Sequence, residues 1–285
     1  MNEIAIHPEN PVTLTPTIQR LTAPNAGIMT GPGTNSYLVG TPESGFIVID
    51  PGPNHPEHIH NLHRSTGGNI RMIVCTHSHA DHSPAAFPLQ ALCPHQPPVL
   101  GLPSADTARP NSFFRPDRVL QNNELLTLDS CALQGIQAIF TPGHAANHVC
   151  FLAPDQGILF SGDHILNGST TVVEPPDGNM GQYLASLELL QNLCQNHAVH
   201  YILPAHGMAI GGTTEAVVLA IEHLRRHRRR RESKVIAVTT AHPDKTVDDW
   251  LPLVYDDVPP ALWPVARRSL LAHLEHIGIA ITIPQ

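Results

Sequence analysis

The sequence predicts an α/β fold followed by a small, mostly helical C-terminal domain. Short apolar segments, each ending in glycine or a polar turn, recur up to Leu203 and are typical of buried strands. Segments with helical spacing lie between and after them, and strands that alternate with helices indicate a layered α/β architecture. The pattern changes near residue 232, after which the chain suggests helix, helix and short strand.

Seven of the expected strands lie before residue 204, and none of the seven contains a charged residue in its centre. Runs of this kind suit strands that are buried within a layered fold. The expected strands are Ser36–Val39, Gly45–Asp50, Arg71–Thr76, Gly135–Thr141, His148–Leu152, Gly157–Ser161 and His200–Leu203.

Helical spacing predicts helices over Gln182–Cys194 and Glu215–Arg231, the latter with Thr214 as its N-cap. In the tail, Thr246 and Asp249 resemble a capping box before a helix over Trp250–Tyr255. The tail's remaining expected elements are a helix from Pro259 through Leu274, a stop at Gly278 and a strand over Ile279–Ile283.

Composition restricts the class of protein. The chain has 285 residues, of which 41% are apolar, so a substantial core is expected. No run of eighteen apolar residues is present, and the N-terminus lacks a basic start with an apolar stretch, so neither a membrane span nor a secretory signal is expected. The five cysteines show no CxxC spacing, which favours reduced thiols and a cytoplasmic location.

The charge is unevenly distributed. The formal net charge is −8, but Arg225–Lys234 carries +6, which leaves −14 for the remainder. An acidic chain is not an obvious nucleic-acid binder, whereas the run Arg225–Arg231 keeps single-stranded RNA open as a partner. The other interpretation of this run is a solvated helix end, where cations favour the helix dipole.

The segment His77–His82 (HSHADH) places three imidazoles and a carboxylate within six residues. In a chain with 20 histidines, a polar surface turn is one interpretation. A metal site is the other, because imidazole and carboxylate are usual metal ligands.

Residues that follow the other expected strands favour the metal site. His144, Asp163 and His206 each come directly after such a strand, beside a glycine, and Asp50 ends another. Ligand groups gather at strand ends in layered α/β proteins, whereas scattered surface histidines would not follow that placement. The candidate ligands are His77, His79, Asp81, His82, His144, Asp163 and His206. Seven groups exceed one four-coordinate ion and suit two divalent ions, Zn²⁺ before iron or manganese.

His77–His82 matches the HxHxDH signature of the metallo-β-lactamase superfamily, and the chain over residues 11–222 resembles its glyoxalase II-like branch. The resemblance implies an αββα sandwich. It also implies one metal held by His77, His79, His144 and Asp163, and another held by Asp81, His82, His206 and the shared Asp163.

Within that superfamily, Gly31–Gly40, Phe160–Val173 and the tail are similar to the lactamase-beta-2-like proteins. This resemblance implies a small winged-helix-like domain after the catalytic one. We therefore expect a hydrolase domain over residues 1–222 and, over residues 223–285, the linker helix end with the winged-helix-like domain.

The expected activity is binuclear hydrolysis in which a metal-bridging hydroxide attacks the substrate. The catalytic residues are expected to be Asp81, Asp163 and His164, with Asp50 orienting a ligand imidazole or capping a turn. His148 is expected to be an ordinary core or supporting histidine, and the loop Asn167–Met180 to border the substrate.

A small thioester or ester is the expected substrate, because the HSHADH and TPGH contexts look like glyoxalase II. The tail does not match that enzyme's glutathione-binding helices. One alternative is a single-strand endoribonuclease, an activity that the lactamase-beta-2-like resemblance permits. Another is a nucleic-acid-binding regulatory module with a vestigial metal site. A homodimer is also open.

Overall fold

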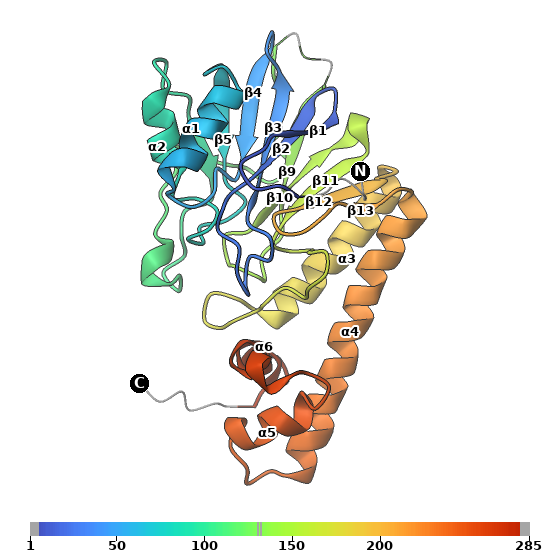
Figure 1. The fold of residues 1–285 in the computed structure, drawn as a ribbon. Coiled ribbons are helices and arrows are strands. Elements are labelled where there is room, and N and C mark those ends of the chain that lie inside the picture. Colours follow the sequence, from blue (N-terminus) through green and yellow to red (C-terminus); the bar gives the residue numbers. More distant parts are fainter. Residues whose placement is uncertain (1–5, 130, 132, 280–285) are drawn as a thin grey trace.

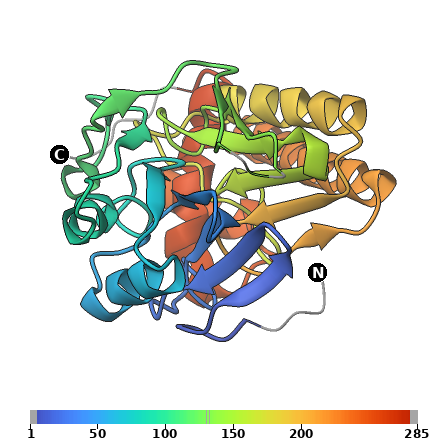
Figure 2. The ribbon, with the colours of Figure 1, turned by 90° about the horizontal axis from the view of Figure 1, so that it is seen from above.

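The computed structural model describes residues 6–129, 131 and 133–279. Its main body consists of two β-sheets packed face to face, each covered on its outer side by helices (Figures 1 and 2). The expected αββα sandwich is confirmed, because apolar side chains of both sheets form one central core.

The first sheet has seven strands in sequence order. They are β1 (Val12–Thr15), β2 (Ile18–Thr22), β3 (Asn35–Thr41), β4 (Gly45–Ile49), β5 (Ile70–Val74), β6 (Val99–Gly101) and β7 (Arg118–Val119). Helices α1 (Pro56–Ser65) and α2 (Ala86–Leu92) cover its outer face through a second apolar cluster. Strands β4 and β5 are parallel, so their carboxyl ends, from which Asp50 and the HSHADH segment emerge, meet at one edge.

The second sheet has six strands in the order β13-β12-β11-β10-β9-β8. They are β8 (Leu125–Leu126), β9 (Ile136–Phe140), β10 (Val149–Ala153), β11 (Ile158–Gly162), β12 (Tyr201–Pro204) and β13 (Ile210–Gly211). Helices α3 (Met180–Asn196) and α4 (Thr214–Ala241) cover its outer face. The seven strands expected before residue 204 are all present, each within two residues of its expected ends.

Helix α4 corrects two expectations. It runs for 28 residues and ends at Ala241, not at Arg231. Its N-cap is Thr213, whose hydroxyl accepts a hydrogen bond from the backbone N–H of Ala216, not Thr214. The second half of α4 leaves the sandwich and becomes the first helix of the C-terminal lobe (Figure 1).

The C-terminal lobe packs α5 (Val247–Val254) and α6 (Trp263–His276) against this extension of α4. The expected capping box between Thr246 and Asp249 is present at the start of α5. The helix expected from Pro259 begins as a single 3₁₀ turn over Pro260–Leu262 before α6. The expected strand Ile279–Ile283 lies almost entirely outside the described residues.

Within the described ranges, no helix combines the length and the apolar character that crossing a bilayer requires. The described cysteines are all free thiols, and four of them are buried.

Candidate metal centre

The centre lies at the edge of the sandwich where strands of both sheets end. The HSHADH segment follows β5 as a tight turn, in which the backbone N–H of His82 donates to the carbonyl of His79. Asp50 fixes the start of this turn, because its carboxylate accepts from both the backbone N–H and the hydroxyl of Thr76, each at 2.7 Å. His144 follows β9, Asp163 follows β11 and His206 follows β12.

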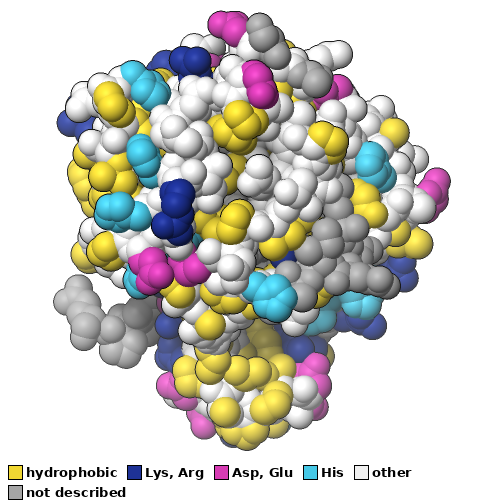
Figure 3. Space-filling model, turned by 45° about the horizontal axis from the view of Figure 1, so that its top comes forward, with side chains coloured by type: hydrophobic (Ala, Val, Ile, Leu, Met, Phe, Trp, Pro, Cys, Tyr) yellow, Lys and Arg dark blue, Asp and Glu magenta, His cyan; other side chains and the backbone are white. Residues whose placement is uncertain are grey.

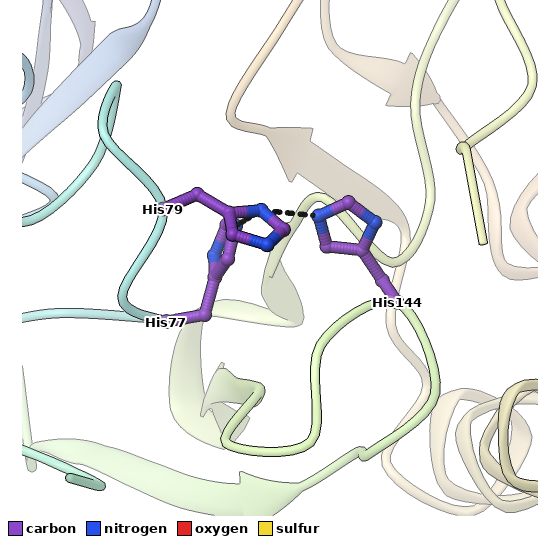
Figure 4. A group of neighbouring side chains, drawn as sticks. All are labelled: His77, His79 and His144. Carbon is purple, nitrogen blue, oxygen red and sulfur yellow. Dashed lines mark hydrogen bonds between the residues drawn. The ribbon is translucent and has the colours of Figure 1, made fainter. Parts of the chain in front are cut away.

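Three imidazoles form the first group of the centre. The Nδ1 atom of His79 lies 2.9 Å from Nε2 of His77 and 3.0 Å from Nε2 of His144. Figure 4 shows the three rings pointing toward one another from two separate loops. Three imidazole nitrogens at such separations form a cluster of ligand atoms of the kind that holds a divalent ion.

Two imidazoles and two carboxylates form the second group. His206 Nε2 lies 3.2 Å from Asp81 Oδ2 and 3.2 Å from Asp163 Oδ1. His82 Nε2 lies 3.5 Å from an oxygen of each of these carboxylates. This mixed set of nitrogen and oxygen atoms is the second cluster with metal-ligand character.

The Asp163 carboxylate lies between the two groups. Its Oδ2 atom is 3.5 Å from Nε2 of His144 in the first group and 3.5 Å from Nε2 of His82 in the second. Two backbone contacts position Asp163: the hydroxyl of Thr171 donates to the backbone carbonyl of Asp163, and the backbone N–H of Asp163 donates to Nε2 of His148. His148 is thus a buried support of the centre, as expected for an ordinary supporting histidine.

The outward ring nitrogens are held by protein acceptors. His82 Nδ1 lies 2.9 Å from Asp50 Oδ2, so the expected orienting contact of Asp50 is present. The Thr76 hydroxyl already donates to Asp50, so it accepts from Nδ1 of His77. The remaining outward contacts are His144 Nδ1 to the Val172 carbonyl, His206 Nδ1 to the Gly33 carbonyl and His79 Nε2 to the Asp177 carboxylate. Each ring is therefore fixed with one nitrogen facing the centre.

The residues fit a pair of divalent ions. His82 Nε2, His206 Nε2 and Asp163 Oδ1 are buried and have no hydrogen-bond partner among the described residues. Polar atoms left in this way are costly in a folded protein unless something binds them. Imidazole and carboxylate together suit Zn²⁺, iron or manganese better than an ion that takes oxygen alone.

Electrostatics at the centre agree with this fit. Burial and the neighbouring His79 lower the pKa of His144 to about 4, so its ring is neutral with a free lone pair. Burial opposes ionisation of Asp163, but His206 and His82 hold the pKa of this carboxyl well below its usual range. Burial likewise opposes a charged His206, yet Asp163 and Asp81 raise its pKa to about 10. The paired carboxylates thus attract positive charge, which bound cations would supply.

His164 does not reach the centre. Its ring is completely buried, packs 4.5 Å from the ring of Tyr183 and contacts the Tyr183 carbonyl through Nε2. Burial, together with His144, lowers the pKa of His164 to about 3. The structure therefore places this expected catalytic residue in the core beneath α3, away from the cavities that open onto the centre.

Two cavities open onto the centre. The first, of about 150 Å³, lies over His79, Asp81, His144 and Asp163 and is named the inner cavity. The second, of about 330 Å³, extends from His144 and Asp163 to the C-terminal lobe and is named the interdomain cavity. The loop Asn167–Met180, which is expected to border the substrate, contributes residues to the lining of both cavities.

Charged residues that the sequence did not single out surround the inner cavity. Asp177 contacts His79, and Glu174 forms ion pairs with both Arg109 and Arg268. Both acidic residues belong to the loop Asn167–Met180, and its position after a candidate ligand is the sequence signal that could have identified them. Arg109 and Arg268 come from distant segments, and no local pattern marks them.

The arginine run is not a solvated helix end. It lies in the middle of α4, where helical periodicity directs its residues to different sides. Arg231 is buried against Asp257 at 2.8 Å, and Arg228 is buried with its guanidinium over the Tyr183 ring. Arg226, Arg229 and Arg230 are exposed. On the face in Figure 3, lysine and arginine side chains lie in several separate places.

Two family models match the chain. The model of the metallo-beta-lactamase superfamily matches residues 29–195, and the model of the beta-lactamase associated winged helix domain matches residues 246–277. The first match contains every candidate ligand except His206, and the second contains α5 and α6.

Curated relatives cover nearly the whole chain. A beta-lactamase-like protein 2 homolog of Caenorhabditis elegans is 31% identical, over 93% of this chain and 84% of the relative. One from Drosophila melanogaster is 28% identical, over 93% of this chain and 88% of the relative. An atrochrysone carboxyl ACP thioesterase of Pseudocercospora fijiensis is 29% identical, over 79% of this chain and 61% of the relative.

Solved structures share the fold. A beta-lactamase domain protein from Burkholderia ambifaria matches with a TM-score of 0.76 and 17% identity, over 96% of this chain and 89% of that chain. The protein TTHA1623 in a di-iron-bound form matches with a TM-score of 0.53 and 29% identity, over 69% of this chain and 95% of that chain.

Proposed function

Because this chain belongs to the metallo-β-lactamase superfamily and is a hydrolase, we propose that it hydrolyses thioesters or related esters with two divalent ions. The observation that carries this proposal is the Asp163 carboxylate, which lies within 3.5 Å of ring nitrogens from both ligand groups beneath an open cavity. A carboxylate in that position is suited to bridge two ions.

The proposed ligand sets divide the centre at Asp163. His77, His79 and His144 would hold one ion, and Asp81, His82 and His206 the other, with Asp163 shared. When bound, the ions supply Lewis acidity, which acidifies a water and polarises the substrate carbonyl. A di-iron form of one relative supports a two-ion centre, while the fit of zinc rests on the imidazole-rich donor set.

The chain's own residues would orient the reacting water and the ligand imidazoles. Asp81 is the more exposed carboxylate of the centre, at 27% of its side chain, and it lines the inner cavity. It is placed to accept a hydrogen bond from a water in that cavity and to align it toward a substrate carbonyl. Asp50, Thr76 and the Val172 carbonyl keep the imidazoles oriented while this occurs.

The name of the fungal relative supports a thioester before other substrates, because that relative is an acyl-carrier-protein thioesterase. The buried arginines of α4 are already paired within the protein, which leaves Arg226, Arg229 and Arg230 as the exposed part of the run. RNA cleavage, the vestigial regulatory module, the homodimer and the cytoplasmic location stay predictions from the sequence.

The test compares substrates on zinc-loaded protein. Acetyl thioester, acetyl ester, a lactone and a labelled single-stranded RNA are supplied to the wild type and to Asp163→Ala. We expect thioester cleavage that is lost in the variant. Cleavage of RNA alone would replace the proposal with the nuclease, and stoichiometric metal without turnover of any substrate would favour the regulatory module.

A further inference from the structure

The interdomain cavity is built from segments far apart in the sequence. Its walls come from the loop after β11, from α4 and from the C-terminal lobe. Apolar side chains line it, and polar residues line it as well, including His227, whose Nδ1 has no hydrogen-bond partner among the described residues. The apolar ones in the walls are Leu166, Val172, Val258, Leu262, Val265 and Ala266, and the other polar ones include Ser169, Thr170 and Ser269. The winged-helix-like lobe is therefore a wall of the same space that contains the metal centre.

The arginines in this wall do not make it an anion site. Arg231 donates to both oxygens of Asp257, at 2.8 and 2.9 Å, and to the Val254 carbonyl. Arg228 donates to the Thr171 carbonyl and lies over the Tyr183 ring. Guanidinium groups engaged in this way fix the lobe and the loop to α4.

The outer rim and one wall atom also indicate a ligand. Ile28 and Met29 line the cavity and are 74% and 45% exposed, so two adjacent apolar side chains are open to solvent at its rim. The Tyr255 hydroxyl is buried in the wall and has no hydrogen-bond partner among the described residues, which leaves it available to an oxygen of a bound molecule. At its inner end the cavity reaches His144 and Asp163.

We propose that the interdomain cavity binds the acyl chain of the substrate and that the C-terminal lobe sets the preferred chain length. The inference rests on the proposed hydrolysis of thioesters or esters. An acyl chain suits the apolar part of a cavity that reaches the centre where its carbonyl would react. A volume of about 330 Å³ is at the lower end of the range for small-molecule sites, which fits a medium-length acyl group.

The test uses binding, so it does not depend on turnover. Hexanoate, octanoate and decanoate are titrated into the full-length, metal-loaded protein by calorimetry, and hydrolysis of an acetyl thioester is measured separately. Each added methylene is expected to raise the affinity about threefold to fourfold in the wild type. Failure of the acetyl thioester assay would count against the proposed function alone.

Matched leucine variants locate the effect. Leu262 lines the cavity and is 38% exposed, whereas Leu253, in the same lobe, is 39% exposed and does not line it. Leu262→Trp is expected to remove the gain from octanoate to decanoate, and Leu253→Trp to retain it. Val265→Trp, from α6, provides a second blocking variant if the first is unstable. Equal chain-length dependence in the blocking and control variants, or none in the wild type, would overturn the proposal.

Discussion

The segments His77–His82 and Arg225–Arg231 are both short clusters of similar side chains, yet the fold uses them in opposite ways. In the first, a turn after β5 brings four side chains toward one centre. In the second, helical periodicity buries Arg228 and Arg231 and leaves Arg226, Arg229 and Arg230 together on the exposed side. A turn thus brings a whole sequence cluster to one centre, whereas a helix divides such a cluster between its faces.

The largest expected effect tests the metal ligands gathered around His77–His82, which are named the convergent cluster. Asp163 contacts both ligand groups, whereas the contacts of Asp81 lie in the second group. Asp163→Asn is therefore expected to weaken both proposed ions and to reduce hydrolysis by more than the about 10- to 100-fold typical of a lost outer contact. Asp81→Asn is expected to leave one ion bound.

Metal content by mass spectrometry of the purified variants, alongside their hydrolysis rates, checks this difference. Two ions retained in Asp163→Asn, with unchanged activity, would contradict the shared position of that carboxylate.

A second prediction concerns the support of the convergent cluster. In Asp50→Asn, an amide N–H₂ can replace the oxygen that accepts from His82, so the ring loses its orientation. Metal affinity is expected to fall about 10- to 100-fold. Glu9→Gln is the matched control, because Glu9 accepts from the buried His58 at 3.2 Å outside the centre.

Competition with a chelator measures both variants of this pair. A change in Glu9→Gln as large as that in Asp50→Asn would mean that general destabilisation, not ring orientation, determines the affinity.

The convergent cluster was predictable because its information is local. Each candidate ligand directly follows an apolar strand, and adjacent strand ends meet at one edge of a sandwich. Asp177, Arg109 and Arg268 were not predictable in this way, because each reaches the cavity through contacts between distant segments. The sequence predicts the end of α4 too early because the residues after Leu224 are mostly charged and show no apolar periodicity. Val235 and Thr239 lie beyond this polar run, and they are buried only in the folded chain, where Val235 packs in the core of the lobe.

The arginine run Arg225–Arg231, named the divergent cluster, gives a third prediction, whose expected effect is of intermediate size. Arg228 is 3% exposed and donates to the Thr171 carbonyl, and the Thr171 hydroxyl in turn holds the backbone of Asp163. Arg228→Gln shortens the donor and leaves that carbonyl unpaired, so we expect a loss of about 1–3 kcal/mol in unfolding free energy. Arg229→Gln, on the exposed side, is expected to change it by less than about 0.5 kcal/mol.

Urea unfolding of the two arginine variants measures the difference between adjacent positions of the same run. Equal losses at both positions would show that the run acts through its total charge and not through the separate contacts of each arginine.

The smallest expected effect tests where α4 begins. Thr213 and Thr214 are adjacent and chemically identical, but only the Thr213 hydroxyl accepts from the Ala216 backbone N–H, at 3.2 Å. Thr213→Ala removes this cap and is expected to cost about 1 kcal/mol, whereas Thr214→Ala is expected to cost less than about 0.5 kcal/mol. Thermal unfolding of both variants provides the measurement. A larger loss in Thr214→Ala would instead place the N-cap at Thr214 and start the helix one residue further along the chain.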